Sequence, residues 1–259
     1  MHARQILAGV ALLAATYDGC RADDAGPAVT PYRPSVSTPA ALSAPGWLEA
    51  EAGAQRVHES GADTRSSTPY TLKLAFTPDW GIRVGGEALV RAPDERGTTT
   101  TGIGDTSVVF KRRFAVNEHS AFGLELGDSF ATARPALHSS SGSNDVSING
   151  IYSADFGAWH ADTNLLVTRL GDIAATEGRT QSLFATALST GLGARWGVVA
   201  ELSGTRQRGV DSSLQWLCAA SYSSSRRVTW DGGVARAHTA GATTWSAFVG
   251  ATVLAARVF

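Results

Sequence analysis

Apolar and polar side chains alternate with a period of two through most of this chain, and helical spacing never replaces that alternation. The stretch YTLKLAFT at 70–77 is one example, with Tyr70 and Leu72 on one face and Thr71 and Lys73 on the other. Successive side chains of a β-strand point to opposite faces, so the pattern predicts strands that are apolar on one side and polar on the other.

Segments with two such faces occur twelve times after the first 45 residues. They cover 46–57, 69–77, 80–91, 104–115, 120–131, 145–156, 158–170, 181–192, 195–206, 213–222, 226–237 and 244–259. Their lengths suit the roughly 9 to 11 residues that a tilted strand needs to cross a bilayer, and short connections alternate with longer polar ones. The sequence therefore predicts an all-β fold over 46–259, a twelve-stranded antiparallel transmembrane up-and-down β-barrel whose last strand closes against its first.

Aromatic residues recur near one end of the predicted strands. Because amphipathic rings settle at membrane interfaces, they are predicted to form a membrane girdle at the inner rim. Its members are Trp80, Trp159, Trp196, Phe114, Phe156 and Phe259. Phe259 also resembles the terminal aromatic signal by which the barrel assembly machinery recognises outer-membrane barrels, although Arg257 departs from the usual alternation.

Charged residues interrupt the predicted lipid face only near strand ends. They are Arg112, Asp128, Arg169, Arg236 and Arg257. A Lys or Arg on that face costs about 2–4 kcal/mol at the bilayer midplane but roughly 0–1 kcal/mol near an interface, so these positions are compatible with a membrane barrel. At the outer rim, Arg169 and Arg236 are expected to meet lipopolysaccharide phosphates.

The N-terminal region differs from the rest of the chain. Residues 1–22 have a basic start, an apolar run and then small residues that suit a cleavage site, which predicts a signal peptide and export. Cys20 is either lipidated or removed with this peptide. Residues 23–45 are rich in Pro and Ala without periodicity, which predicts an extended periplasmic lead-in. This lead-in is long enough to enter the barrel as a plug.

The predicted inner face carries charges of both signs. The candidate pore-lining residues are Lys73, Arg83, Glu87, Arg91, Lys111, Arg113, Glu125, His160, Asp162, Glu201, Arg227 and Asp231, and Glu49, Glu51 and Asp155 share this face. Two interpretations stay open together: a cross-strand ion-pair network that holds the barrel, and a lining that orients a polar or amphiphilic solute.

Several function classes find little support. The 22 basic and 23 acidic residues balance, which argues against nucleic acid as a partner. The histidines are scattered without paired spacing, so neither a metal nor another cofactor is expected. His160 and Asp162 share a face, which raises a lipid hydrolase as a third hypothesis, but no serine lies in a nucleophile motif. No enzymatic activity is therefore expected.

Two stretches carry a resemblance to a known family. RPSVSTPAALSAPGWLEAEAG at 33–53 and GIGDTSVVFKRRF at 102–114 resemble the outer-membrane barrels labelled as transporters of the meta pathway of phenol degradation. The resemblance covers most of the chain after residue 33 and implies a bacterial outer-membrane barrel that admits small aromatic or other apolar solutes. It transfers no functional residues.

These observations together predict an outer-membrane channel of a Gram-negative bacterium that allows passive uptake of small molecules. The expected partners are the lipid bilayer, lipopolysaccharide, the barrel assembly machinery and a small-molecule solute. The alternative is a barrel with a structural or surface-interaction role that transports nothing, its lumen shut by the inner ion pairs.

Overall fold

The computed structural model describes residues 26–59, 64–93, 98–133 and 142–259. The predicted signal peptide at 1–22 lies outside this part of the chain. Within it, no helix has the length and apolar character needed to cross a membrane.

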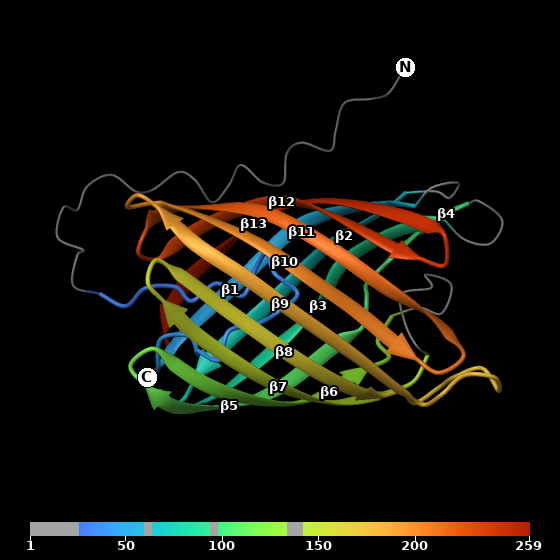
Figure 1. Ribbon diagram of the computed structural model, residues 1–259, viewed down its shortest axis with the longest axis horizontal. Helices are drawn as coiled ribbons and strands as arrows, with labels where there is room; N and C mark the ends of the chain where they lie inside the picture. The colour runs from blue at the N-terminus through green and yellow to red at the C-terminus, as the bar shows by residue number, and fades with distance from the viewer. Residues whose placement is uncertain (1–25, 60–63, 94–97, 134–141) are drawn as a thin grey trace, which may run out of the picture.

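The described chain forms one antiparallel sheet that closes on itself (Figure 1). Its strands are β1 Trp47–Glu59, β2 Arg65–Ala75, β3 Trp80–Pro93, β4 Thr99–Gly102, β5 Thr106–Asn117, β6 Ser120–Phe130, β7 Asp145–Phe156, β8 Trp159–Arg169, β9 Thr180–Leu192, β10 Trp196–Gln207, β11 Val210–Ser225, β12 Val228–Thr239 and β13 Ala242–Arg257. Pairing of β1 with β13 closes the barrel, so no open edge is left in it.

Two of these segments together make one strand of the barrel. Both β4 and β5 pair with β3, β4 along Val90–Pro93 and β5 along Trp80–Gly86. Residues 103–105 interrupt the strand that β4 and β5 share. The prediction of a closed twelve-stranded antiparallel barrel is therefore confirmed.

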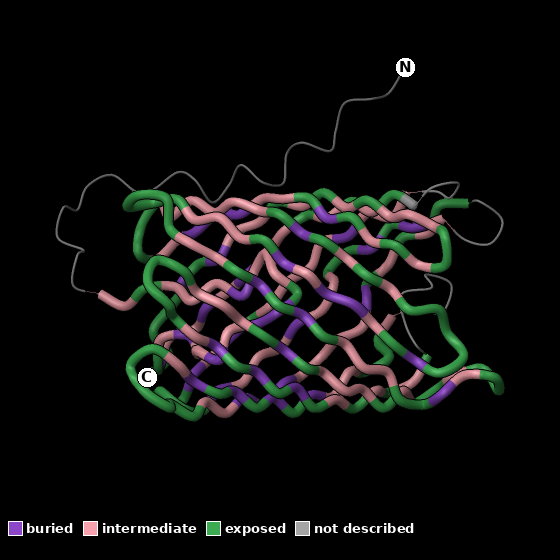
Figure 2. Tube along the Cα trace, in the orientation of Figure 1, coloured by how far each residue is buried: buried purple, intermediate pink, exposed green. Residues whose placement is uncertain are grey.

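Exposure alternates along the strands, as the sequence pattern predicts (Figure 2). On β6, for example, Phe122, Leu124 and Leu126 are exposed, whereas Glu125 is buried. The apolar side chains thus point away from the barrel and the polar ones point into it. This arrangement suits a barrel with hydrocarbon outside and polar groups inside.

The two ends of the barrel differ in their connections. The inner end, which holds the start of β1 and the end of β13, has tight connections such as the turn Gly157–Ala158 between β7 and β8. Gly157 has a φ of 66°, a left-handed conformation that favours glycine. The outer end holds the longer connections, including 131–144 and 170–179.

A β-bulge in β3 overturns one prediction. Thr68 pairs with Leu89 but the next residue, Pro69, pairs with Glu87, so Ala88 is an extra residue. The bulge reverses the facing of all later residues in the strand. Val90 is therefore buried inside, and Arg91, predicted to line the pore, is exposed on the outer face.

Candidate solute pathway in the barrel lumen

Residues 26–45, termed here the lumen segment, lie inside the barrel near its inner end (Figure 1, blue). The segment has no helix or strand of its own beyond a single bridge between Pro45 and Ala75. Its backbone groups therefore need partners on the wall, because a buried N–H without one costs free energy. Inward-facing polar side chains of the strands supply those partners.

The first contacts are with β1 and β2. The backbone N–H of Thr30 donates to Glu49 Oε2 at 2.9 Å, and that of Tyr32 donates to Glu51 Oε1 at 2.7 Å. Lys73 Nζ lies 2.6 Å from Glu49 Oε1 and 2.5 Å from Glu51 Oε1, and it donates to the Thr30 carbonyl at 2.6 Å. One buried lysine is thus the shared cation of the two carboxylates that hold the segment.

Arg33 ties the segment to the closing strands. Its guanidinium makes a bidentate contact with Asp231, with Nε and Nη2 3.1 and 3.0 Å from the two carboxylate oxygens. Gly53 and Gly250 pair across β1 and β13 beside it. A Cβ at Gly53 would lie 2.7 Å from Arg33 Cζ, and one at Gly250 would lie 2.5 Å from Nε. The two glycines therefore make the space that the guanidinium occupies.

The segment then crosses to the opposite wall. The backbone N–H groups of Val36 and Ser37 donate to the two oxygens of Glu201 at 3.1 and 2.8 Å, and the Ser37 hydroxyl donates to the same carboxylate at 2.8 Å. The Thr38 N–H donates to Asn164 Oδ1 at 3.0 Å. Strands β8 and β10 thus hold the middle of the segment.

The segment ends its crossing on β7. The Ala40 N–H donates to Ser153 Oγ at 2.7 Å, and the Ala40 side chain packs against Ala121 and Ile151 in a small buried cluster. The segment thus contacts β1 and β13 on one side of the barrel and β7, β8 and β10 on the other. It therefore spans the lumen instead of lining one side.

Tyr32 lies between two cations at the centre of this arrangement. The Nζ atoms of Lys73 and Lys111 lie 3.9 and 4.4 Å from its ring centroid, a distance at which cation–π attraction operates. Burial raises the pKa of Tyr32, and the nearby Glu125 carboxylate adds to the effect. The phenol therefore stays protonated and donates to the Ala41 carbonyl at 2.7 Å.

Glu125 joins a second group of inner charges. Arg83 Nη2 and Lys111 Nζ each lie 3.2 Å from one of its oxygens, and Asn149 donates to it at 2.9 Å. Lys111 also donates to the Pro39 carbonyl of the lumen segment. Two ion pairs and one amide hydrogen bond thus join β3, β5, β6 and β7, and Lys111 connects this group to the segment.

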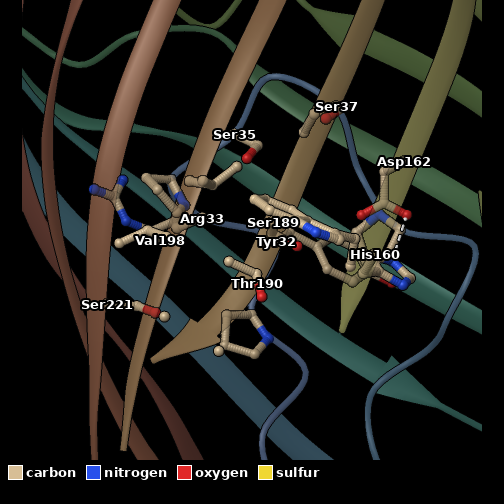
Figure 3. A pocket seen from close by; sticks show the side chains of 18 of the residues that line it. Tyr32, Arg33, Ser35, Ser37, His160, Asp162, Ser189, Thr190, Val198 and Ser221 are labelled. Carbon is tan, nitrogen blue, oxygen red and sulfur yellow. Dashed lines mark hydrogen bonds and ion pairs between the residues drawn. The ribbon is translucent and has the colours of Figure 1, made fainter. Parts of the chain in front are cut away.

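A cavity of about 410 Å³ remains between the lumen segment and the wall of β7–β12 (Figure 3). Short side chains of the wall leave this space, among them Ser189, Gly197 and Ser221. A second space of about 570 Å³ shares Pro31, Ser221 and Thr229 with it and lies toward the inner turns. The first of these spaces is termed here the vestibule, and both lie in the inner half of the lumen.

His160 borders this cavity, and among the described residues no serine contacts its ring. Its Nδ1 lies 2.6 Å from Asp155 Oδ1 and its Nε2 lies 3.0 Å from Asp162 Oδ1. The Ser153 hydroxyl donates to Asp162 at 2.5 Å. Both ring nitrogens of His160 thus contact carboxylates, which is not the serine–histidine contact that a hydrolase needs. Within the described residues no group of three or more His, Cys, Asp or Glu could hold a metal ion.

The other predicted pore-lining residues lie nearer the rims. Glu87 pairs with Arg65 at 2.5 Å, and Arg113 lies 4.0 Å from Asp79 of the inner turn. Arg227 lies in the turn before β12, with its guanidinium 4.9 Å from the Trp47 ring centroid. It therefore lies at the inner rim and does not line the lumen.

The predicted girdle residues are all exposed on the barrel. Trp80, Trp159 and Trp196 each begin a strand, and Phe114 and Phe156 lie near the inner ends of β5 and β7. Phe259 follows β13, and its N–H and that of Val258 face the Gly46 carbonyl at 3.4 and 2.7 Å. Their role as a membrane girdle remains a prediction.

Weakening one anchor should loosen the segment without removing it. In Glu201→Gln, one of the two carboxylate oxygens that accept from Val36 and Ser37 becomes an NH₂ group. Since a hydrogen bond to a charged group contributes about 1.5–3 kcal/mol, the amides of these two residues should exchange with solvent roughly tenfold faster or more. Hydrogen-exchange mass spectrometry measures this. The exposed Glu118→Gln should leave the rates unchanged, and equal rates in both variants would contradict the anchor role.

Comparisons with known proteins identify the fold. No protein-family model and no curated protein matches the sequence. Among solved structures, an outer membrane channel from Pseudomonas putida F1 aligns with a TM-score of 0.64 at 11% identity, over 82% of this chain and 97% of that one. The CymD monoaromatic hydrocarbon channel aligns at 0.55 and 8% identity, over 83% and 90% of the two chains. The NanC porin aligns at 0.55 and 7% identity, over 78% and 98%.

At these identities the alignments show a shared fold, that of outer-membrane barrel channels and porins. The resemblance to the meta-pathway family rests on the two sequence stretches alone, because no family model supports it.

Proposed function

We propose that this chain is an outer-membrane channel through which small molecules diffuse passively, along a path narrowed by the lumen segment. The observation that carries the proposal is the closed barrel with an apolar outer face, a polar inner face and a vestibule of about 410 Å³ beside the segment. Polar wall groups that the lumen segment leaves uncovered, such as Ser189 and Ser221, can contact water or a solute that enters this space.

The vestibule supports a small solute. Its wall offers the hydroxyls of Ser189, Thr190 and Ser221, and the lumen segment offers the apolar rings of Pro31 and Pro34. Such a site accepts a compact molecule with one apolar face and one or two hydrogen-bonding groups. Together with the resemblance to the meta-pathway family and the fold shared with a monoaromatic hydrocarbon channel, this supports small aromatic compounds as the solute class.

The second candidate is a barrel that transports nothing. The observation in its favour is the extent of the lumen segment, whose anchors include Glu49, Glu201 and Ser153 on separate parts of the wall. If the segment closes the whole cross-section of the lumen, the barrel transports nothing and serves a structural or surface role.

Liposome swelling with the refolded full chain separates the two candidates. Phenol-sized solutes should enter several-fold faster than disaccharides. In Ser189→Trp a large side chain fills the vestibule, so uptake should fall several-fold. The matched control is Leu188→Trp, one residue away on the outer face, where an aromatic ring suits the lipid and uptake should stay unchanged.

No swelling with any solute would overturn the channel and favour the structural role. Equal uptake by the wild type and Ser189→Trp would leave transport in place but exclude the vestibule as its route.

A further inference from the structure

The outer face of the barrel carries a groove that the channel does not use. It runs over β12, β13, β1, β2 and β3 and has a volume of about 710 Å³. Short outward-facing side chains, Ala54, Ser66 and Ala247, leave this space between longer neighbours. A convex barrel wall has a depression of this size only where small residues are neighbours on adjacent strands.

Two arginines lie at one end of this groove. Arg56 of β1 pairs with Ser66 of β2, which in turn pairs with Arg91 of β3, so the three residues form one row. Two strand spacings separate the arginines, or about 10 Å between Cα atoms. Long side chains can close this distance, so both guanidinium groups can reach one anion placed over Ser66.

Neither arginine has an anionic partner in the described chain. The ion pairs there involve Arg33, Arg65, Arg83 and Arg113 among the arginines, and no hydrogen bond of the Arg56 or Arg91 side chain occurs. The bulge at Ala88 is what turns Arg91 outward beside Arg56. Two cations on a lipid-facing wall repel each other unless an anion lies between them.

The rest of the groove is apolar and extends toward the middle of the wall. Leu89, Val234 and Val249 border it with half or more of their surfaces exposed. Arg56 and Arg91 lie near the outer ends of β1 and β3, beyond these apolar residues. The groove therefore matches an amphiphile whose anionic head lies at the outer rim and whose hydrocarbon points toward the midplane.

We propose that this groove binds the lipid A part of lipopolysaccharide, with a phosphate held between Arg56 and Arg91 and an acyl chain lying along Leu89, Val234 and Val249. Arginine suits this role because its planar guanidinium makes paired hydrogen bonds with phosphate oxygens. Lipid A lies in the outer leaflet of an outer membrane, and both arginines lie near the outer ends of their strands. The proposal rests on an outer-membrane location but not on transport.

Native mass spectrometry of the detergent-solubilised full chain, titrated with bisphosphorylated lipid A, tests the proposal. The double variant Arg56→Ala/Arg91→Ala should need about tenfold more lipid A for half saturation, since two charge-assisted contacts are lost. The matched control is Arg206→Ala, an exposed outward arginine of β10 outside the groove, which should bind as the wild type does. Ala247→Trp fills the groove but keeps both arginines, and it should weaken binding as well.

Four further outcomes would overturn the site. Equal affinity for dephosphorylated lipid A would exclude the phosphate contact, and equal affinity for phosphatidylglycerol would exclude selection of lipid A. Full displacement of lipid A by millimolar inorganic phosphate would show that the arginines hold a free anion. An equal loss of lipid A affinity in Arg206→Ala would show that the general positive charge of the rim, and not this groove, binds the lipid. Each outcome leaves the liposome swelling test of transport unaffected.

Discussion

Deletion of residues 26–43 should raise the single-channel conductance of the refolded barrel several-fold in planar lipid bilayers. The segment now crosses the lumen from β1 to β7, and its backbone and side chains occupy space that ions would otherwise use. A twelve-stranded barrel lies between the filled eight-stranded barrels and the open porins, so one peptide crossing takes up much of its cross-section. The deletion ends before Ala44, whose carbonyl accepts from Trp47 at the start of β1.

A second variant, which keeps the whole segment, tests the same prediction even if the deletion variant does not fold. Arg33→Ala combined with Glu201→Gln removes the bidentate contact with Asp231 and weakens the hold on Val36 and Ser37. Brief openings of larger conductance should appear in its current records. The exposed Glu118→Gln should behave as the wild type. An unchanged conductance in a folded deletion variant, or records without such openings in the double variant, would show that the segment does not limit the pore.

The strands could be predicted from the sequence because two environments act on each of them. Hydrocarbon outside and polar groups inside impose a period of two, and twelve repeats of it fixed the strand number and the closure of β13 on β1. The prediction fails at Ala88 for the same reason. Ala88, Leu89 and Val90 are all apolar, so both faces of β3 carry apolar side chains at this point. The alternation therefore does not reveal the extra residue that turns Arg91 outward.

The lumen segment could be predicted only in outline. Its lack of periodicity suggested an extended peptide, but its anchors are mainly backbone N–H groups, which every residue except proline provides. Tyr32, Arg33 and Ser37 therefore did not stand out as site residues. The wall carried a clearer signal, since Gly53 and Gly250 on the inner face of paired strands mark a place where another group comes close.

Replacement of Lys73 by alanine should strongly destabilise the folded barrel. The side chains of Lys73, Glu49 and Glu51 are each at most 3% exposed, and the lysine is the cation for both carboxylates. Its loss leaves two neighbouring buried anions and removes the donor to the Thr30 carbonyl. Removing one partner of a buried ion pair costs about 3–5 kcal/mol. Urea unfolding from lipid vesicles, followed by tryptophan fluorescence, measures the change.

A variant that removes all three charges together shows whether Lys73→Ala loses stability through the unpaired carboxylates or through a packing defect. In the triple variant Glu49→Gln/Glu51→Gln/Lys73→Met, the amide oxygens still accept from the Thr30 and Tyr32 N–H groups, and no buried anion lacks a cation. Most of the lost stability should therefore return, because neutral groups of similar volume often replace a buried ion pair without penalty. The exposed Arg206→Ala should change stability by less than about 0.5 kcal/mol. If the triple variant is as unstable as Lys73→Ala, the ion pairs are not what fixes the lumen segment to β1 and β2, and packing around Tyr32 must hold it instead.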